Sequence, residues 1–254
     1  MKQTVGGADL RRMIISAAAA IENNKQALNE LNVFPVPDGD TGTNMSMTIN
    51  AAASDLRKAD DPDLGSAAKI AASAMLRGAR GNSGVILSLL FRGISRKLKG
   101  CDHCDGVLWA AALQEGVDAA YKAVMKPAEG TILTVIRVIA EDAQRYVAKK
   151  PRTVAEVLDK MIRSGEAILE KTPDMLPALK QAGVVDSGGQ GLLTVFKGWR
   201  AAYNGEKIEE TAAGVGNAAT FEFEDDHDAL EELTFKYCTE FVIQDMNEGV
   251  TEDD

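Results

Sequence analysis

The chain has 254 residues, 45% hydrophobic and 5% aromatic, which is long enough for one large or two smaller domains with a substantial core. No basic stripe with interleaved aromatic residues occurs, and the net charge is −10, so a DNA- or RNA-binding role is disfavoured. Three cysteines do not make a disulfide framework, and neither a signal peptide nor an apolar run of membrane-spanning length is evident, so we expect a cytoplasmic protein.

The negative charge is concentrated near the C-terminus. Residues 221–254 contain thirteen Asp or Glu residues and one Lys, a local balance of −12. Residues 1–220 therefore sum to +2, and this larger part of the chain is nearly neutral.

Apolar residues at helical spacing predict an all-α body. The first helix is expected over residues 8–31, where Leu10, Met13, Ile14 and Ala17 share one face. The abundance of alanine and glycine suits helices that pack closely. Further helices are expected over residues 42–59, 65–77, 84–98, 105–125, 131–148 and 153–170, then a short helix after 172–173, and an eighth long helix that opens at 185–189 and ends near 203.

Loops rich in Gly, Ser, Thr and Asn precede the second, fourth, sixth and eighth predicted helices. Short connections favour antiparallel neighbours, so alternate helices should begin at the same end of the bundle. Four helix N-termini would then direct their positive dipole ends at one place. This arrangement suits a triphosphate with its metal ions.

The first of these loops, residues 32–44, carries two carboxylates, Asp38 and Asp40, on either side of a glycine. Magnesium takes oxygen ligands and is often held by one or two carboxylates together with substrate phosphates. An ordinary turn is the alternative, since Asp and Gly both favour turns. A calcium loop of the EF-hand type fits poorly, because its later ligands and closing Glu are missing.

The other three loops, residues 81–84, 130–131 and 186–189, offer further groups for an anion. Each of them alone is also typical of a turn or a helix cap, and the functional interpretation depends on all four occurring in alternating register. No Walker A motif occurs, and no Gly-x-Gly-x-x-Gly after a strand supports a Rossmann site. Cations that are candidates for compensating phosphate charge are Arg77, Arg80, Arg92, Lys126 and Arg137.

The segment Cys101-Asp-His103-Cys104 has metal-binding residue types but no second pair at zinc spacing, so a polar turn between helices is favoured. His103 and His227 both fall in predicted loops away from the glycine-rich loops. A histidine-dependent triad or phosphohistidine mechanism is therefore disfavoured.

Three segments are expected along the chain: a helical domain over 1–205, a linker over 206–233, and the start of a second domain over 234–254. Residues 235–243 alternate like a strand. A single strand is not stable by itself, so it either pairs with another chain or belongs to a domain that is cut short here.

Taken together, the four loops resemble those of the ATP-binding subunit of dihydroxyacetone kinases. Residues 32–44, 78–88 and 183–192 are similar in particular to the N-terminal kinase domain of bacterial fatty acid kinase. The resemblance covers about residues 8–204. It implies an eight-helix antiparallel up-and-down barrel with Mg-ATP at one end and further domains after it, so that the chain resembles a truncated form.

The resemblance also implies site residues. Asp38 and Asp40 match the Mg²⁺-binding carboxylates on which catalysis depends. The dihydroxyacetone branch has a further Asp before this pair, and Asn32, displaced by one residue, is the third candidate metal ligand. The implied nucleotide-binding residues are Thr41, Gly42, Thr43, Asn44, Gly81, Asn82, Ser83, Gly84, Thr131, Ile132, Asp186, Ser187, Gly188 and Gly189.

For function, the resemblance implies ATP-dependent phosphorylation of a fatty acid carboxylate, giving an acyl phosphate, with ATP/ADP and Mg²⁺ as cofactors. It implies a separate fatty-acid-binding protein of the DegV type as partner, no nucleic acid and no membrane insertion, and a homodimer of the full-length protein is a further expectation. Two alternatives stay open: a kinase for dihydroxyacetone or a similar small hydroxy compound, and a regulatory module that holds nucleotide.

Overall fold

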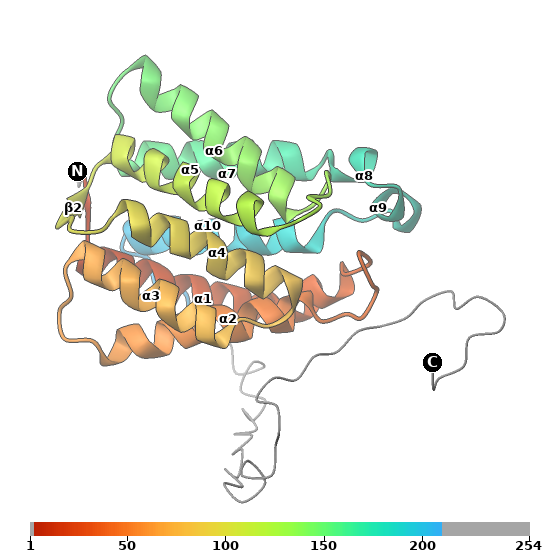
Figure 1. Ribbon diagram of the computed structural model, residues 1–254, viewed down its shortest axis with the longest axis horizontal. Coiled ribbons are helices and arrows are strands. Elements are labelled where there is room, and N and C mark those ends of the chain that lie inside the picture. The colour runs from red at the N-terminus through yellow and green to blue at the C-terminus, as the bar shows by residue number, and fades with distance from the viewer. Residues whose placement is uncertain (1–2, 210–254) are drawn as a thin grey trace, which may run out of the picture. The chain divides into compact units, whose positions relative to one another are not determined.

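The computed structural model describes residues 3–209, so the predicted strand over 235–243 and most of the linker lie outside the described residues. Within residues 3–209 the chain forms eight helices of at least 15 residues, two short helices and two short strands (Figure 1). The all-α prediction is confirmed. The elements are β1 (Val5–Gly6), α1 (Gly7–Glu30), α2 (Thr41–Lys58), α3 (Leu64–Gly78), α4 (Gly81–Lys97), β2 (His103–Cys104), α5 (Gly106–Ala123), α6 (Ile132–Lys149), α7 (Val154–Leu169), α8 (Thr172–Met175), α9 (Pro177–Ala182) and α10 (Ser187–Tyr203).

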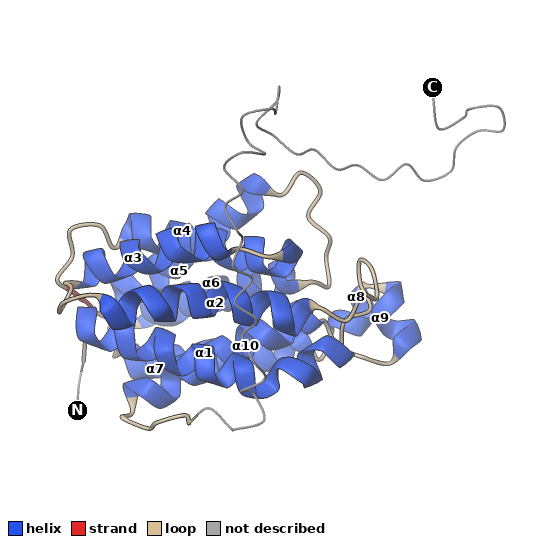
Figure 2. Cartoon of the chain, turned by 90° about the horizontal axis from the view of Figure 1, so that it is seen from below, coloured by secondary structure: helices blue, strands red, loops and turns tan. Residues whose placement is uncertain are grey.

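The long helices form a closed ring. Each packs against the next long helix along the chain, and α10 closes the ring by packing against both α7 and α1. Successive long helices run in alternate directions, so α2, α4, α6 and α10 all begin at the end where α8 and α9 lie (Figures 1 and 2). Chain order and short connections therefore place every second helix start at one end of the ring.

Several helices begin at a side chain that caps the first turn. The Thr153 hydroxyl, the predicted cap of the seventh helix, accepts a hydrogen bond from the Glu156 backbone N–H, and the Glu156 carboxylate accepts one from the Thr153 N–H. This reciprocal pair satisfies two backbone donors that the helix itself leaves free. Asp63, Asp105 and Asp186 cap α3, α5 and α10 in a similar way.

Small residues let neighbouring helices approach closely, as the composition predicts. A Cβ built on Gly198 of α10 would lie 2.7 Å from the Ala17 Cα of α1, and one on Gly93 of α4 would lie 2.2 Å from the Glu115 carbonyl oxygen of α5. These contacts leave no room for a larger residue. No helix within residues 3–209 combines the length and the apolar character needed to cross a lipid bilayer.

The mainly aliphatic core of the ring contains an aromatic cluster around Trp199, which is fully buried. Its ring centroid lies 5.0 Å from that of Phe196, 5.4 Å from Trp109 and 5.6 Å from Phe91. The Phe91 and Trp109 rings meet Trp199 edge-on, a geometry that aromatic quadrupoles favour. Four helix residues from α4, α5 and α10 thus form one apolar contact inside the ring.

The strands β1 and β2 form an antiparallel ribbon, with Val5 opposite Cys104 and Gly6 opposite His103. Residues 101–104 do connect two helices, as predicted, but they also pair with the start of the chain, which local sequence patterns did not indicate. Burial raises the pKa of the Cys104 thiol far above its usual range, so this sulfur stays protonated near neutral pH.

Candidate functional site

The loop between α1 and α2 is organised by the buried side chain of Asn32. Its amide nitrogen donates to an Asp38 carboxylate oxygen, and its amide oxygen accepts a 2.8 Å hydrogen bond from the Thr41 hydroxyl. Asp38 is exposed, and Asp40 occupies the N-cap of α2 without using its carboxylate as a cap. Both carboxylates therefore keep oxygen atoms free for a cation, while Asn32 ties Asp38 to the helix start.

Asn32 remains a predicted metal ligand. In this structure its amide oxygen already accepts the Thr41 hydroxyl, so its observed role is to orient the loop. Among residues 3–209 no three Asp, Glu, His or Cys side chains gather into a cluster that could hold a metal ion. The carboxylate pair fits Mg²⁺, which needs few protein ligands when phosphates supply the others.

The first turn of α2 is fixed against the end of α1. The Asn29 amide oxygen accepts from the Thr43 backbone N–H at 3.1 Å, and its amide nitrogen donates to the Thr43 hydroxyl, also at 3.1 Å. A Cβ on Gly42 would lie 2.1 Å from the Lys25 carbonyl oxygen, so only glycine permits this contact. Sequence reasoning missed Asn29; the available signal was a polar amide in the last turn of an amphipathic helix.

The second loop packs directly on the first. Helix α4 begins at Gly81, three residues earlier than predicted, so Asn82 and Ser83 belong to its first turn. Gly81 has a φ of +56°, and a Cβ there would lie 2.2 Å from the Asn44 amide nitrogen. The glycine both allows the chain to turn into the helix and lets α4 start beside the first turn of α2.

The third and fourth loops meet through Asp186. Its buried carboxylate caps α10 by accepting from the Gly189 N–H at 2.7 Å, and the Ile132 backbone at the start of α6 helps to lower its pKa. A Cβ on Gly188 would lie 3.1 Å from the Ile132 Cβ. Thr131 is the N-cap of α6, as its predicted place at the helix start requires.

The start of α10 also contacts α1 and α2, the two helices that the first loop connects. The Ser187 hydroxyl donates to the Leu28 carbonyl oxygen near the end of α1 at 2.5 Å. A Cβ on Gly191 would lie 2.4 Å from the Met45 sulfur of α2. All four predicted loops are thus connected by packing or hydrogen bonds at one end of the ring.

This end has the electrostatics of an anion site beside a cation site. Four helix N-termini place partial positive charge there, although side chains already accept from the Thr43 and Gly189 N–H groups, and Asp38 and Asp40 add carboxylate oxygens. Two of the candidate cations are already paired: Arg77 with Asp55 at 2.8 Å, and Arg137 with Glu129 at 2.9 Å. Arg80, another candidate cation, is the N-cap residue of α4, so a positive side chain lies beside the backbone groups at this end.

Burial raises the pKa of Asp186 from its usual 3.8 to about 6, because desolvation outweighs the hydrogen bonds from the Gly189 and Ile132 backbone. A carboxyl group with a higher pKa in the folded state binds its proton more tightly when folded. Its contribution to stability is complete below the unfolded pKa and is lost as pH rises through the folded pKa, that is, between roughly pH 4 and 6.

Asp186→Asn cannot titrate but still caps a helix. We expect its free energy of unfolding, relative to that of the wild type, to increase by about 3 kcal/mol as pH rises from about 4 to 7. Urea unfolding of both proteins at a series of pH values measures the difference. If the free energies of unfolding of the two proteins change in parallel with pH, burial does not disfavour the ionised form of Asp186.

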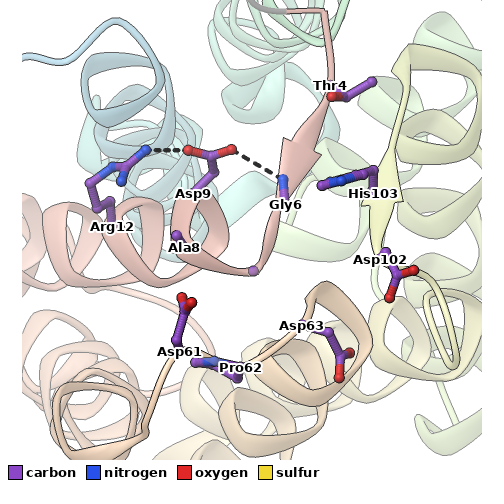
Figure 3. Close-up of a pocket in the computed structure, with 11 residues that line it drawn as sticks. Thr4, Gly6, Ala8, Asp9, Arg12, Asp61, Pro62, Asp63, Asp102 and His103 are labelled. Carbon is purple, nitrogen blue, oxygen red and sulfur yellow. Dashed lines mark hydrogen bonds and ion pairs between the residues drawn. The ribbon is translucent and has the colours of Figure 1, made fainter.

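A different cavity, of about 540 Å³, opens at the opposite end of the ring, beside β1 and β2. Figure 3 shows the Asp9, Asp61, Asp102 and His103 side chains around it, with Asp9 hydrogen-bonded to the Gly6 N–H. None of the predicted site residues lines this cavity. His103 lies here, away from the four loops, as the sequence predicts.

Residues 35–201 match the DAK2 domain. The chain is 41% identical over 247 residues to the protein YloV of Bacillus subtilis, an alignment that covers 95% of this chain and 44% of YloV. It is 40% identical over 249 residues to a protein of Staphylococcus epidermidis, with 96% and 45% of the two chains covered. The chain therefore spans less than half the length of these curated relatives.

Solved structures share the fold. The native dihydroxyacetone kinase of C. freundii superposes with a TM-score of 0.59 at 20% identity, covering 80% of this chain and 36% of that one. The same enzyme in complex with AMP-PNP and Mg²⁺ gives a TM-score of 0.58 at 19% identity, covering 80% and 35%. At these identities the likeness concerns the helical architecture.

Proposed function

The chain belongs to the DAK2 domain family, and on that premise we propose that it is a kinase domain whose four clustered helix N-termini bind Mg-ATP. The acceptor we propose is the carboxylate of a fatty acid, presented by a separate fatty-acid-binding protein of the DegV type, and the product is an acyl phosphate. The observation that carries the nucleotide site is the meeting of the four loops at one end of the ring. The architecture shared with an enzyme solved with AMP-PNP and Mg²⁺ supports it.

In the proposed reaction a carboxylate oxygen attacks the γ-phosphorus, the bond from the γ-phosphorus to the β,γ-bridging oxygen breaks, and ADP leaves with the bonding electrons. The acceptor is already ionised at neutral pH, so no general base has to remove a proton. The protein's task is to align the two oxygens and to neutralise phosphate charge.

Asp38 and Asp40 would hold Mg²⁺, which when bound neutralises part of the phosphate charge. Asn32 holds Asp38 in place, and Asn29 holds the first turn of α2, so both act by positioning. The Asn82 and Ser83 side chains lie in the first turn of α4 and offer polar groups to the phosphates.

The rival acceptor is dihydroxyacetone or a similar hydroxy compound, and the structural likeness to a dihydroxyacetone kinase favours it. A hydroxyl acceptor must lose a proton to a general base, which can be a histidine or a carboxylate. Within residues 3–209 the single histidine, His103, lies at the opposite end of the ring from the four loops. A base for the hydroxyl acceptor would therefore have to be a carboxylate at the four loops, such as Asp38 or Asp40, or come from outside the described residues.

The test is phosphate transfer from γ-labelled ATP by the full-length protein, with three acceptors: the fatty-acid-loaded DegV-type protein, the free fatty acid, and dihydroxyacetone. We expect a labelled product with the loaded protein that hydroxylamine converts to a hydroxamate, the reaction of an acyl phosphate. A hydroxylamine-resistant product with dihydroxyacetone, and none with fatty acid, would assign the rival function.

A further inference from the structure

We propose that Thr134, Glu129 and Arg137 form a positioning network that sets nucleotide affinity by holding the Gly130 turn in front of α6. The inference rests on the proposed nucleotide site and names residues that sequence patterns did not single out for this role. None of the three is proposed to touch the nucleotide. They act through the turn and through the loop that opens α10.

Thr134 lies at the centre of the network and is 1% exposed. Its hydroxyl accepts from the Gly130 backbone N–H at 2.9 Å and donates to a Glu129 carboxylate oxygen at 2.7 Å. A single buried hydroxyl thus satisfies a buried backbone donor and fixes the carboxylate one residue before the turn. Replacing it with an apolar group would leave the Gly130 N–H without its acceptor.

Arg137 anchors the network on its outer side. Its guanidinium donates to the same Glu129 oxygen at 2.9 Å, to the Tyr121 hydroxyl of α5 at 3.2 Å, and to Glu141 at 3.3 Å. Hydrogen bonds from Thr134 and Arg137 hold the pKa of Glu129 below its usual range, so the carboxylate stays ionised and the network stays formed near neutral pH. Arg137 is therefore occupied in joining α5 to the turn, and we assign it this role in place of the predicted phosphate contact.

On its inner side the turn packs against α8, and α8 is hydrogen-bonded to the loop that opens α10. Gly130 has a φ of +83°, and a Cβ there would lie 2.9 Å from the Met175 Cβ and 3.1 Å from the Thr172 carbonyl oxygen, both in α8. The fully buried Thr172 hydroxyl accepts from the Asp186 backbone N–H at 3.1 Å. A shift of the turn would therefore move two loops of the proposed site together.

The test compares Thr134→Val, which keeps the shape but removes the hydroxyl, with Thr134→Ser, which keeps the hydroxyl. For Thr134→Val we expect the Kd for AMP-PNP with Mg²⁺, measured by titration calorimetry, to rise about 10-fold, and the KM for ATP of the full-length protein to rise in parallel. Turnover at saturating ATP should stay within about 3-fold, because the loops at Asp38 and Gly81 are untouched. Thr134→Ser should bind within about 2-fold of the wild type.

A merely structural role would lower the fraction of active protein, and so the binding stoichiometry and the apparent kcat, while leaving Kd and KM unchanged. That result for a folded Thr134→Val protein overturns the inference and leaves the proposed function intact. Absence of nucleotide binding by the wild type would overturn both.

If Thr134→Val does not fold, Arg137→Met answers the same question from the half-buried outer end of the network. Arg137→Met should also raise the Kd for AMP-PNP, by a smaller factor than Thr134→Val. An unchanged Kd would overturn the inference. Arg145→Met serves as the matched control, since Arg145 lies on the same helix and pairs with Asp142 away from the turn. Its Kd should equal that of the wild type.

Discussion

Replacing Asp38 with alanine is expected to lower phosphate transfer by about 10³-fold or more, because the γ-phosphate then loses charge compensation that acts in the transition state. The helices should remain intact, since the Asp38 side chain is exposed and its one described partner is the Asn32 amide. Initial rates with γ-labelled ATP, together with circular dichroism of the same protein, measure both parts of the expectation.

Asp40→Ala should give a comparable loss, and Asp38→Asn should also be inactive because an amide supplies no negative charge. Asp102→Ala is the matched control: it removes an exposed carboxylate at the opposite end of the ring and should leave the rate unchanged. Turnover of Asp38→Ala within about 10-fold of the wild type at saturating Mg²⁺ would remove the metal-ligand role.

Trp199→Ala is expected to destabilise the ring by about 3–5 kcal/mol, the range for truncating a large buried aromatic residue. The indole ring of Trp199 is fully buried and lies at centroid distances of 5.0–5.6 Å from three other aromatic rings, so its removal leaves a large cavity. Urea unfolding of the wild type and the variant measures the loss.

Trp199→Phe measures how much of the loss depends on the volume of the indole ring. Within residues 3–209 the Trp199 indole nitrogen has no hydrogen-bond partner, so phenylalanine gives up ring volume but no hydrogen bond. We expect it to cost clearly less than alanine. A loss below about 1 kcal/mol for Trp199→Ala would mean that the interior collapses readily around the missing ring.

The order of the helices and the meeting of the four loops were predictable, because they follow from local signals. Apolar periodicity places each helix, and short connections make neighbours antiparallel, so alternate helix starts share one end. The cap at Thr153 and the opening of α10 at Asp186 could likewise be predicted, since capping depends on a few adjacent residues.

The contacts that join the loops could not be predicted. The bond from Ser187 to Leu28 spans 159 positions, and the pairing of Asn29 with Thr43 depends on how each helix is rotated about its axis. Apolar periodicity indicates which face of a helix is buried but not which helix packs against that face. The β1–β2 ribbon was missed for the same reason, since two-residue strands carry no sequence pattern of their own.

The Thr134 network shows where long-range structure changes a local interpretation. From sequence, Arg137 is a cation on a helix near a glycine-rich loop, which predicts a phosphate contact. In the folded chain three groups, Glu129, Glu141 and the Tyr121 hydroxyl, already engage its guanidinium. Only the tertiary arrangement distinguishes a ligand-binding arginine from one that positions a loop.

The central claim is that the four loops form one nucleotide site, and a crystal structure of the chain grown with AMP-PNP and Mg²⁺ tests it most directly. We predict triphosphate density at the N-termini of α2, α4, α6 and α10, with Asp38 and Asp40 oxygens about 2.0–2.1 Å from Mg²⁺. Nucleotide bound elsewhere, for example in the cavity beside Asp61 and His103, with the four helix starts free of phosphate, would contradict the account.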